Sequence, residues 1–348
     1  MSQSSHLQTN EPKKQPKIAI VIPVYNVAAY LHECFDSILS QSHTNFTVFA
    51  VNDGSTDESG AILDSYAAKG NRIVVLHQKN SGQGNARNLA LDIIDKDGTF
   101  DYVSFIDGDD KVSPDFLSHL AQSANINQSD ITNCGFFKFD DEGHTTLEGQ
   151  LNPKANLDKD EFVEFIFSQL RWKHVCGAGG MVCTKLFSAS TIKGIRFPTD
   201  RDLVEDELFC LHAALSANKI SYLPEMLYGY RKRPNSSTRN ERFILQHFKG
   251  RHHCINVAKK ISNKSELIAV SAFTQSALRL LKTTNDIPSI NLSEYKAFLE
   301  KASKEGFLDK KTVKLYTLFC EHPKIARIYF GQKKLINSLK FWKHSSKN

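Results

Sequence analysis

Short apolar runs alternate with helical patterns along the first half of the chain. The runs are rich in β-branched residues, which is typical of strands buried on both faces of a parallel sheet. They occupy residues 17–24, 46–51, 72–77, 102–106 and 130–137. Apolar residues between them recur at helical spacing, as in 27–40. Alternating strands and helices predict an α/β fold with a mostly parallel sheet, flanking helices and right-handed crossovers.

The pattern changes toward the C-terminus. We expect a helix over 158–175 and a less regular stretch up to residue 240. Further helices are predicted at 243–261, 265–282, 293–301 and 325–342. With a boundary near Arg239, the chain divides into a disordered arm (1–16), an α/β domain (17–240) and a helical C-terminal region (241–348).

Polar residues follow directly after three of the predicted strands. Tyr25 and Asn26 follow the first strand, Asp53 follows the second, and an acidic cluster at 107–110 follows the fourth. Ligands of open α/β sheets bind outside the carboxyl ends of the strands. We therefore expect these residues to meet at one rim. Ser55 or Thr56 is also expected to cap the next helix.

The acidic cluster carries the clearest chemistry. In Asp107-Gly108-Asp109 two carboxylates stand two positions apart, and Gly108 allows a tight turn. Such hard oxygen ligands suit Mg²⁺ or Mn²⁺, which also bind diphosphate oxygens. The alternative is an acidic surface turn at the start of a helix. The position after a buried strand favours the metal site.

Three other motifs have both a functional and a structural interpretation. Tyr25, after Pro23 and Val24, can stack on a nucleobase or close a strand edge. A Gly-rich loop from Gly82 opens a helix containing Arg87, and can present backbone N–H groups to phosphate. Its spacing fits neither a dinucleotide fingerprint nor a P-loop. Glu205-Asp206-Glu207 can supply a general base or simply complement a helix dipole.

Composition narrows the class of protein. The net charge of +6 is small for 348 residues, and we expect no nucleic-acid partner. Seven scattered cysteines without a CxxC pair predict reduced thiols. The N-terminus has no apolar signal-peptide core, and no run of about 18 apolar residues exists to span a membrane. These features predict a cytoplasmic protein.

Taken together, the motifs resemble those of family 2 glycosyltransferases with the GT-A fold, of the bacterial surface-polysaccharide type. The matching segments run in the family's order over about two-thirds of the chain. They are VIPVYN (21–26), VNDGSTDES (51–59), NSGQGNARNLAL (80–91), FIDGDD (105–110), TKLF (184–187), VEDELF (204–209) and YRKRPNSST (230–238). The resemblance implies an inverting, metal-dependent transfer from a nucleoside-diphosphate sugar, by family habit a UDP-sugar, to a glycan or lipid-linked acceptor.

The resemblance also implies roles for single residues. Asp206 would be the catalytic base, with Glu205 and Glu207 as neighbours of open role, although the three adjacent carboxylates leave the register uncertain. Asp109 would ligate the metal, and Asp107 would face the ribose or a metal-bound water. The residues that would bind the nucleotide are Pro23, Tyr25, Asn26, Asp53, Gly82, Arg87 and Gly108. Those that would close over the diphosphate are Arg231, Arg233 and Ser236.

Two other functions compete with the transferase. A sugar nucleotidyltransferase would need a Gly-rich basic loop after the first strand, where this chain has Tyr25-Asn26-Val27. A non-catalytic nucleotide-sugar or polysaccharide-binding relative would be marked by loss of Asp109 or of the 205–207 cluster, and both are present.

The C-terminal tail is basic and amphipathic. Residues 322–348 hold seven Lys/Arg and no acidic residue. Segment 324–343 can lie on the inner face of the plasma membrane, or pack on its own domain with a solvated basic face. The sequence leaves both interpretations open.

Overall fold

The computed structural model describes residues 15–146, 155–167, 179–200, 204–233, 241–283 and 296–321. Within these ranges ten strands form one sheet, whose main path runs β3-β2-β1-β4-β9-β6-β10-β5. The strands are β1 (Ile18–Val24), β2 (Phe46–Asp53), β3 (Ile73–Gln78), β4 (Tyr102–Phe105), β5 (Lys111–Val112), β6 (Ile131–Phe139), β7 (Thr145–Thr146), β8 (Asn156–Leu157), β9 (Lys185–Ser188) and β10 (Ile220–Arg231).

The half of the sheet that carries the predicted rim is parallel. Strands β3, β2, β1 and β4 all run in the same direction. Beyond them, β9 lies antiparallel to both β4 and β6, whereas β6 and β10 are parallel. The α/β fold predicted from the sequence is confirmed.

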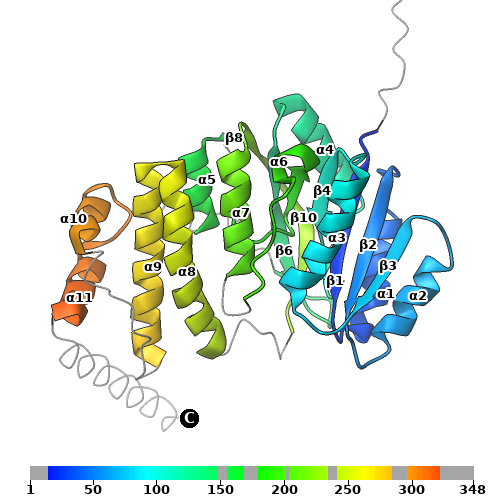
Figure 1. The fold of residues 1–348 in the computed structure, drawn as a ribbon, viewed down its shortest axis with the longest axis horizontal. Coiled ribbons are helices and arrows are strands. Elements are labelled where there is room, and N and C mark those ends of the chain that lie inside the picture. The colour runs from blue at the N-terminus through cyan, green and yellow to red at the C-terminus, as the bar shows by residue number, and fades with distance from the viewer. Residues whose placement is uncertain are drawn as a thin grey trace, which may run out of the picture.

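Helices cover both faces of this sheet (Figure 1). One face packs on α1 (Ala28–Leu39), α2 (Ser59–Ala67) and α4 (Phe116–Asn127). The other packs on α3 (Gln83–Asp97), α5 (Lys159–Ile166) and α7 (Glu205–Ser216). The short α6 (Ala189–Ile192) follows β9. Alternation along β1 explains the two cores, because Ile20 and Ile22 face the first set while Ala19 and Val21 face the second.

The C-terminal helices are α8 (Glu241–Ile261), α9 (Asn263–Thr283), α10 (Lys296–Lys304) and α11 (Lys310–Glu321). Helix α8 packs against α7 and α5, α9 packs against α8 and α5, and α10 and α11 pack against α9 (Figure 1). Phe248 of α8 stacks on Phe273 of α9 with ring centroids 5.2 Å apart, and both belong to the same apolar cluster as Phe209 of α7. Asp160 of α5 also accepts a hydrogen bond from Ser265 of α9 at 2.6 Å. The helical region therefore shares a core with the α/β part.

The sequence-based boundaries hold for the strands of the first half and fail in places later. The stretch up to residue 240 is not irregular, because it contains β9, α7 and the twelve-residue β10. Pro224 and Glu225 interrupt the β10 pattern, and the register with β6 shifts on either side of Met226. Helix α11 was not predicted. The boundary near Arg239, residues 1–14 of the predicted arm 1–16 and the tail segment 324–343 lie outside the described residues. The last two residues of that arm are described, and the carbonyl of Gln15 accepts a hydrogen bond from Asn45 at 2.8 Å.

Two helix ends also differ from the prediction. Helix α5 ends at Ile166, earlier than the predicted end at residue 175. The described range that contains it ends at residue 167. Helix α2 begins at Ser59 and has no side-chain cap from Ser55 or Thr56. Instead, the Ser55 hydroxyl accepts a hydrogen bond from the backbone N–H of Asn26 at 3.1 Å. Thr56 donates its own N–H to the Asn26 side chain at 2.8 Å, so both residues join the loops after β1 and β2.

We expect a chain that ends at residue 240 to be much less stable than the full chain. Its loss of α8 and α9 would expose the apolar faces of α5 and α7, which these helices bury. Thermal unfolding followed by circular dichroism should show a midpoint at least about 10 °C lower, or aggregation before unfolding. An unchanged midpoint would mean that the helical region is an independent domain.

Candidate active site

The carboxyl ends of β2, β1 and β4 lie side by side, because β1 pairs in parallel with both of its neighbours. The segments that follow these strands therefore meet at one edge of the sheet. Tyr25 and Asn26 follow β1, Asp53 ends β2, and residues 107–110 follow β4. The start of α7 is brought to the same edge by Arg87.

Arg87 of α3 joins carboxylates from two remote segments. Its side chain is 1% exposed. One terminal nitrogen donates to Asp107 at 2.8 Å, and the other donates to Asp206 at 2.9 Å and Glu205 at 3.2 Å. Burial alone would lower the pKa of Arg87, but the charges of Asp206, Asp107 and Glu205 raise it above its ordinary value. Arg87 is therefore a fixed buried cation shared by three carboxylates.

The carboxylates above this cation remain accessible. The side chains of Asp107 and Asp206 are each 28% exposed, whereas Arg87 beneath them is almost fully covered. The guanidinium also lies over the ring of Phe197, with 5.1 Å to the centroid. Arg87 Nε is a buried nitrogen without a hydrogen-bond partner in the described part of the chain. Arg87 thus orients the acids from below and leaves their outer sides open.

The two acids at the start of α7 are held in different ways. Burial raises the pKa of Glu205 to about 7, with Arg87 opposing and the Asp206 charge adding to the rise. Burial also raises the pKa of Asp206, while Arg87 counteracts it. The second oxygen of Asp206 accepts a hydrogen bond from the backbone N–H of Val182 at 3.3 Å. Both acids have pKa values displaced toward neutrality, which suits proton transfer.

Glu207 belongs to a different contact. Its carboxylate forms a two-pronged pair with Arg251 of α8, at 2.8 and 3.1 Å. Burial would raise the pKa of Glu207, but Arg251 outweighs it and lowers the pKa. Arg251 also donates to Ser276 of α9 at 3.0 Å. Glu207 therefore ties α7 to the C-terminal helices.

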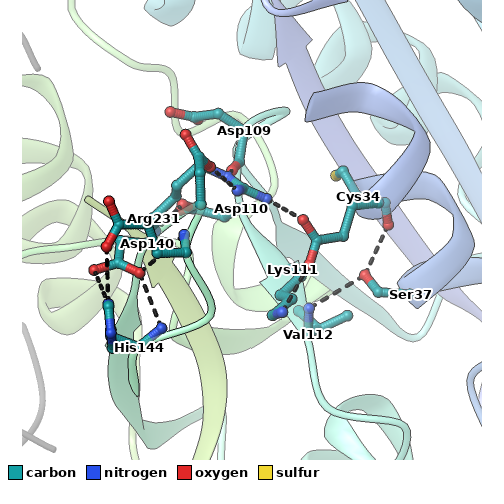
Figure 2. A network of polar contacts seen from close by, with 12 residues as sticks. Cys34, Ser37, Asp109, Asp110, Lys111, Val112, Asp140, His144 and Arg231 are labelled. Atoms are coloured by element: carbon teal, nitrogen blue, oxygen red, sulfur yellow. Dashed lines mark hydrogen bonds and ion pairs between the residues drawn. The ribbon is translucent and has the colours of Figure 1, made fainter. Parts of the chain in front are cut away.

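The turn after β4 is anchored by Asp110, which the sequence analysis did not single out. The Tyr228 hydroxyl donates to Asp110 at 2.6 Å, and the backbone N–H of Arg231 donates to its other oxygen at 2.8 Å. The same hydroxyl accepts the backbone N–H of Asp107 at 3.2 Å. Figure 2 shows Asp110 and Asp109 beside Arg231 at the end of β10. The turn that carries Asp107 and Asp109 is thus fixed to β10.

Asp109, the residue predicted to ligate a metal, is paired with an arginine. Its carboxylate bonds the guanidinium of Arg233 at 2.6 Å. Burial and the nearby Asp107 charge raise the pKa of Asp109, with Arg233 opposing them. A carboxylate close to other carboxylates is stabilised by a nearby cation. For Asp109 this cation is the guanidinium of Arg233. A single protein carboxylate is also the usual donor for Mg²⁺ that is bound chiefly by substrate phosphates. The residues present therefore fit a divalent cation.

No cluster of three or more His, Cys, Asp or Glu side chains in the described ranges is arranged to hold a metal by itself. A metal at Asp109 would need further oxygens from a bound substrate. Five buried cysteines form no disulfide in the described part of the chain: Cys34, Cys134, Cys183, Cys210 and Cys254.

The two arginines expected to close over a diphosphate have different surroundings. Arg231 is buried, with its terminal nitrogens bonded to Glu33 and Asp141 and its Nε donating to the Asp109 carbonyl at 2.8 Å. It is held inside the fold by these contacts. Arg233 is 32% exposed and contacts Asp109, so it is the better placed of the two to reach a ligand. Ser236 lies outside the described residues.

Tyr25 has the exposure that a stacking platform requires. The side chain of Tyr25 is 48% exposed. Pro23, two residues earlier, is half-buried within β1, where it lies opposite Val51 of β2. Asn26 adopts a positive φ of 51° and its side chain accepts from the loop after β2. Tyr25 therefore projects from a rigid junction between two loops.

Asp53 organises the loop before α3. One oxygen accepts from Gln78 and from the backbone N–H of Ser81, both at 2.7 Å, and the other accepts from the N–H of Gly82 at 2.8 Å. Gly82 has a φ of 96°, which favours glycine. Gly108 packs on α1, since an added Cβ would lie 3.3 to 3.4 Å from Val24, Val27 and Leu31. Roles for Asp53, Gly82 and Gly108 in nucleotide binding remain predictions.

None of the described helices is both long and apolar enough to cross a bilayer. The predicted basic segment 324–343 is not among them.

Residues 19–188 of the chain match the model of glycosyl transferase family 2. The chain is 36% identical over 225 residues to the uncharacterized glycosyltransferase EpsJ and 30% identical over 222 residues to the putative glycosyltransferase EpsH, both of Bacillus subtilis (strain 168). These matches cover 64% and 62% of this chain. They span 63% and 61% of the relatives, which is less than two thirds of their length.

The fold is also similar to that of solved glycosyltransferases. S. aureus TarS 1-349 in complex with UDP-GlcNAc aligns with a TM-score of 0.65 at 20% identity, covering 89% of each chain. The mannosyltransferase PcManGT from Pyrobaculum calidifontis, in complex with GDP-Man and Mn2+, aligns with a TM-score of 0.51 at 15% identity, over 93% of this chain and 88% of the other. The chain has a GT-A fold, and its residues 19–188 match glycosyl transferase family 2.

We expect Arg251→Met to destabilise the protein by about 3–5 kcal/mol, because it leaves the buried Glu207 carboxylate unpaired. Denaturant unfolding would measure the loss. The double variant Arg251→Met/Glu207→Gln should recover much of it, since the unpaired charge is gone. Equal stability of Arg251→Met and the unchanged protein would show that the pair does not hold α7 to α8.

Proposed function

We propose that this chain transfers a sugar from a nucleoside-diphosphate sugar to a hydroxyl of a glycan or glycolipid, with inversion at the anomeric carbon. The observation that carries the proposal is the shared contact of Arg87 with Asp107, Glu205 and Asp206. It brings an acid at the end of a parallel strand, where ligands of such sheets bind, next to a second acid suited to proton transfer. The match of residues 19–188 to glycosyl transferase family 2 supports the same chemistry.

The donor nucleotide would lie over the rim formed by the loops after β1, β2 and β4. The exposed ring of Tyr25 would stack on the base, and Asp53 would accept a hydrogen bond from it with its remaining lone pairs. Asp107 would face the ribose. We propose a UDP-sugar, because a structural neighbour with the same fold was solved with UDP-GlcNAc.

The reaction would be a single displacement with Asp206 as the general base. Asp206 takes the proton of the acceptor hydroxyl, and that oxygen forms a bond to the anomeric carbon. The bond from this carbon to the diphosphate breaks, and its electron pair leaves with the diphosphate. Because the oxygen attacks from the face opposite the leaving group, the configuration inverts. Arg87 fixes the side chain of Asp206 throughout, so little reorganisation is needed.

A divalent cation, Mn²⁺ or Mg²⁺, would be held by Asp109 and would neutralise charge on the leaving diphosphate. Arg233 would leave Asp109 when the donor binds and pair with the diphosphate instead. Arg231 is already bonded to Glu33 and Asp141, and would hold the segment from which Arg233 extends.

The acceptor would belong to capsule, lipooligosaccharide or exopolysaccharide synthesis. A glycosyltransferase 32% identical over 221 residues is the poly(ribitol-phosphate) beta-glucosyltransferase of Bacillus spizizenii, of which the match covers 32%. A lipid-linked acceptor would give the basic segment 324–343 a reason to contact the inner face of the plasma membrane. The alternative function is binding of a nucleotide sugar or polysaccharide without catalysis. Release of free nucleotide would distinguish a transferase from such a binding protein.

We expect Asp206→Asn to lower turnover by about 100-fold or more while leaving donor binding nearly unchanged, because the amide cannot accept the acceptor proton. Release of free nucleotide would measure turnover, and calorimetry would measure binding. Glu205→Gln is the matched control, since it removes a neighbouring charge on the same Arg87, and its loss should be clearly smaller. Full activity in Asp206→Asn would refute the assignment of the base.

We expect Asp109→Ala to weaken donor binding in the presence of Mn²⁺ and to abolish the effect of EDTA on that binding. The reason is that Asp109 would be the protein ligand of the cation that the diphosphate shares. Calorimetric titration with UDP, with and without EDTA, tests this directly. Donor affinity that is insensitive to EDTA in the unchanged protein would argue against a metal at Asp109.

A further inference from the structure

Lys185 is a fully buried lysine at the start of β9. It lies in the TKLF segment, which the proposed mechanism does not use. Its Nζ donates to the backbone carbonyl of Met181 at 2.5 Å and to the Thr184 hydroxyl at 3.4 Å. The ring centroid of Phe162 lies 5.9 Å away. Lysine is rarely buried completely, because removing an ammonium group from water is costly. A methionine would fill the same space at lower cost.

The partner of Lys185 leads directly to Asp206. The carbonyl of Met181 and the N–H of Val182 belong to the same peptide group. Lys185 bonds the carbonyl side of this group, and the N–H side donates to Asp206 Oδ2 at 3.3 Å. A cation on a carbonyl oxygen draws electron density from the amide and makes its N–H a stronger donor. One peptide group therefore connects a buried amine to the acid proposed as the base.

The position of this peptide is fixed by close packing. A Cβ added at Gly180 would lie 2.9 Å from Cγ of Glu207 and 3.0 Å from the carbonyl of Ile166. The loop before Met181 therefore touches α7 one residue after Asp206 and touches the end of α5. The Thr184 hydroxyl donates to Asn133 of β6 at 3.0 Å and fixes the other end of the loop.

We propose that Lys185 is a positioning residue for the reaction. Acting through the 181–182 peptide, it orients the carboxylate of Asp206 and stabilises its ionised form. The inference rests on the proposed function, since it assumes that Asp206 is the base. Asp206 would then be held from two sides, by Arg87 through Oδ1 and by this peptide through Oδ2.

The charged groups around Asp206 and Lys185 determine in which direction a change at Lys185 moves the pKa of Asp206. Asp206 faces Arg87, which stabilises its charge, and the acids Asp107 and Glu205, which oppose it. Around Lys185 burial lowers the pKa, whereas Cys210, Cys183, Asp206 and Cys134 act in the opposite direction. Removing the positive charge of Lys185 would raise the pKa of Asp206. The base would then need a higher pH to lose its proton, and the acidic side of the pH–rate profile would move upward.

The experiment compares the full chain with Lys185→Met. The probe is UDP-N-acetylglucosamine with Mn²⁺, and the signal is UDP released by transfer to water from about pH 5 to about pH 9. We expect kcat at neutral pH to fall about 10-fold and the acidic midpoint to rise by about one pH unit. The Kd for UDP should stay unchanged, because Lys185 lies behind the carboxylate and not among the residues proposed to bind the nucleotide.

Thr184→Val is the matched control. It removes a hydroxyl that contacts the same Nζ but keeps the bond from Lys185 to Met181. It should lower the unfolding temperature without moving the acidic midpoint. If Lys185→Met does not fold, Lys185→Gln takes its place, since it keeps a polar donor but lacks the charge. We expect it to move the midpoint in the same direction.

An unmoved midpoint in a folded Lys185 variant would overturn the proposal, and so would failure of both variants to fold, which would make Lys185 purely structural. Failure of the proposed function is seen separately in the unchanged protein, as absence of nucleotide binding, or in Asp206→Asn as full activity.

Discussion

The site depends on one buried guanidinium. Arg87 joins Asp107, just after strand β4, to Glu205 and Asp206 at the start of α7, which lie 118 and 119 residues after Arg87 in the chain. Burying an arginine is costly unless carboxylates surround it, and bringing three carboxylates together is unfavourable unless a cation lies between them. Each part therefore needs the other. Loss of Arg87 would leave three acids facing one another without the cation that they share.

A second layer of contacts supports this arrangement. Tyr228 and the backbone of Arg231 hold Asp110, and so fix the turn that carries Asp107 and Asp109. Glu207 and Arg251 tie α7 to the C-terminal helices. Because the acids are positioned before any ligand arrives, the energy of donor binding need not be used to assemble them. The exception is Arg233, whose contact with Asp109 must break for a metal to bind there.

The sequence predicted the part of this picture that depends on local pattern. Strand β1 could be recognised because its β-branched run is buried on both faces, and the polar residues after β1, β2 and β4 could be placed at one edge because parallel strands end together. Strand β10 was missed because Pro224 and Glu225 break its alternation at a bulge. The partners of Glu207 and Lys185 could not be predicted, because Arg251 and the Met181 carbonyl are brought to them only by tertiary packing.

The most direct test of the account is a crystal structure of the protein with a UDP-sugar and Mn²⁺. We expect the nucleobase to lie against the ring of Tyr25. We also expect the diphosphate to lie beside Asp109, with Arg233 turned away from Asp109. Arg87 should still bond Asp107 and Asp206. A nucleotide bound elsewhere on the molecule, with Arg233 still paired to Asp109, would contradict the account.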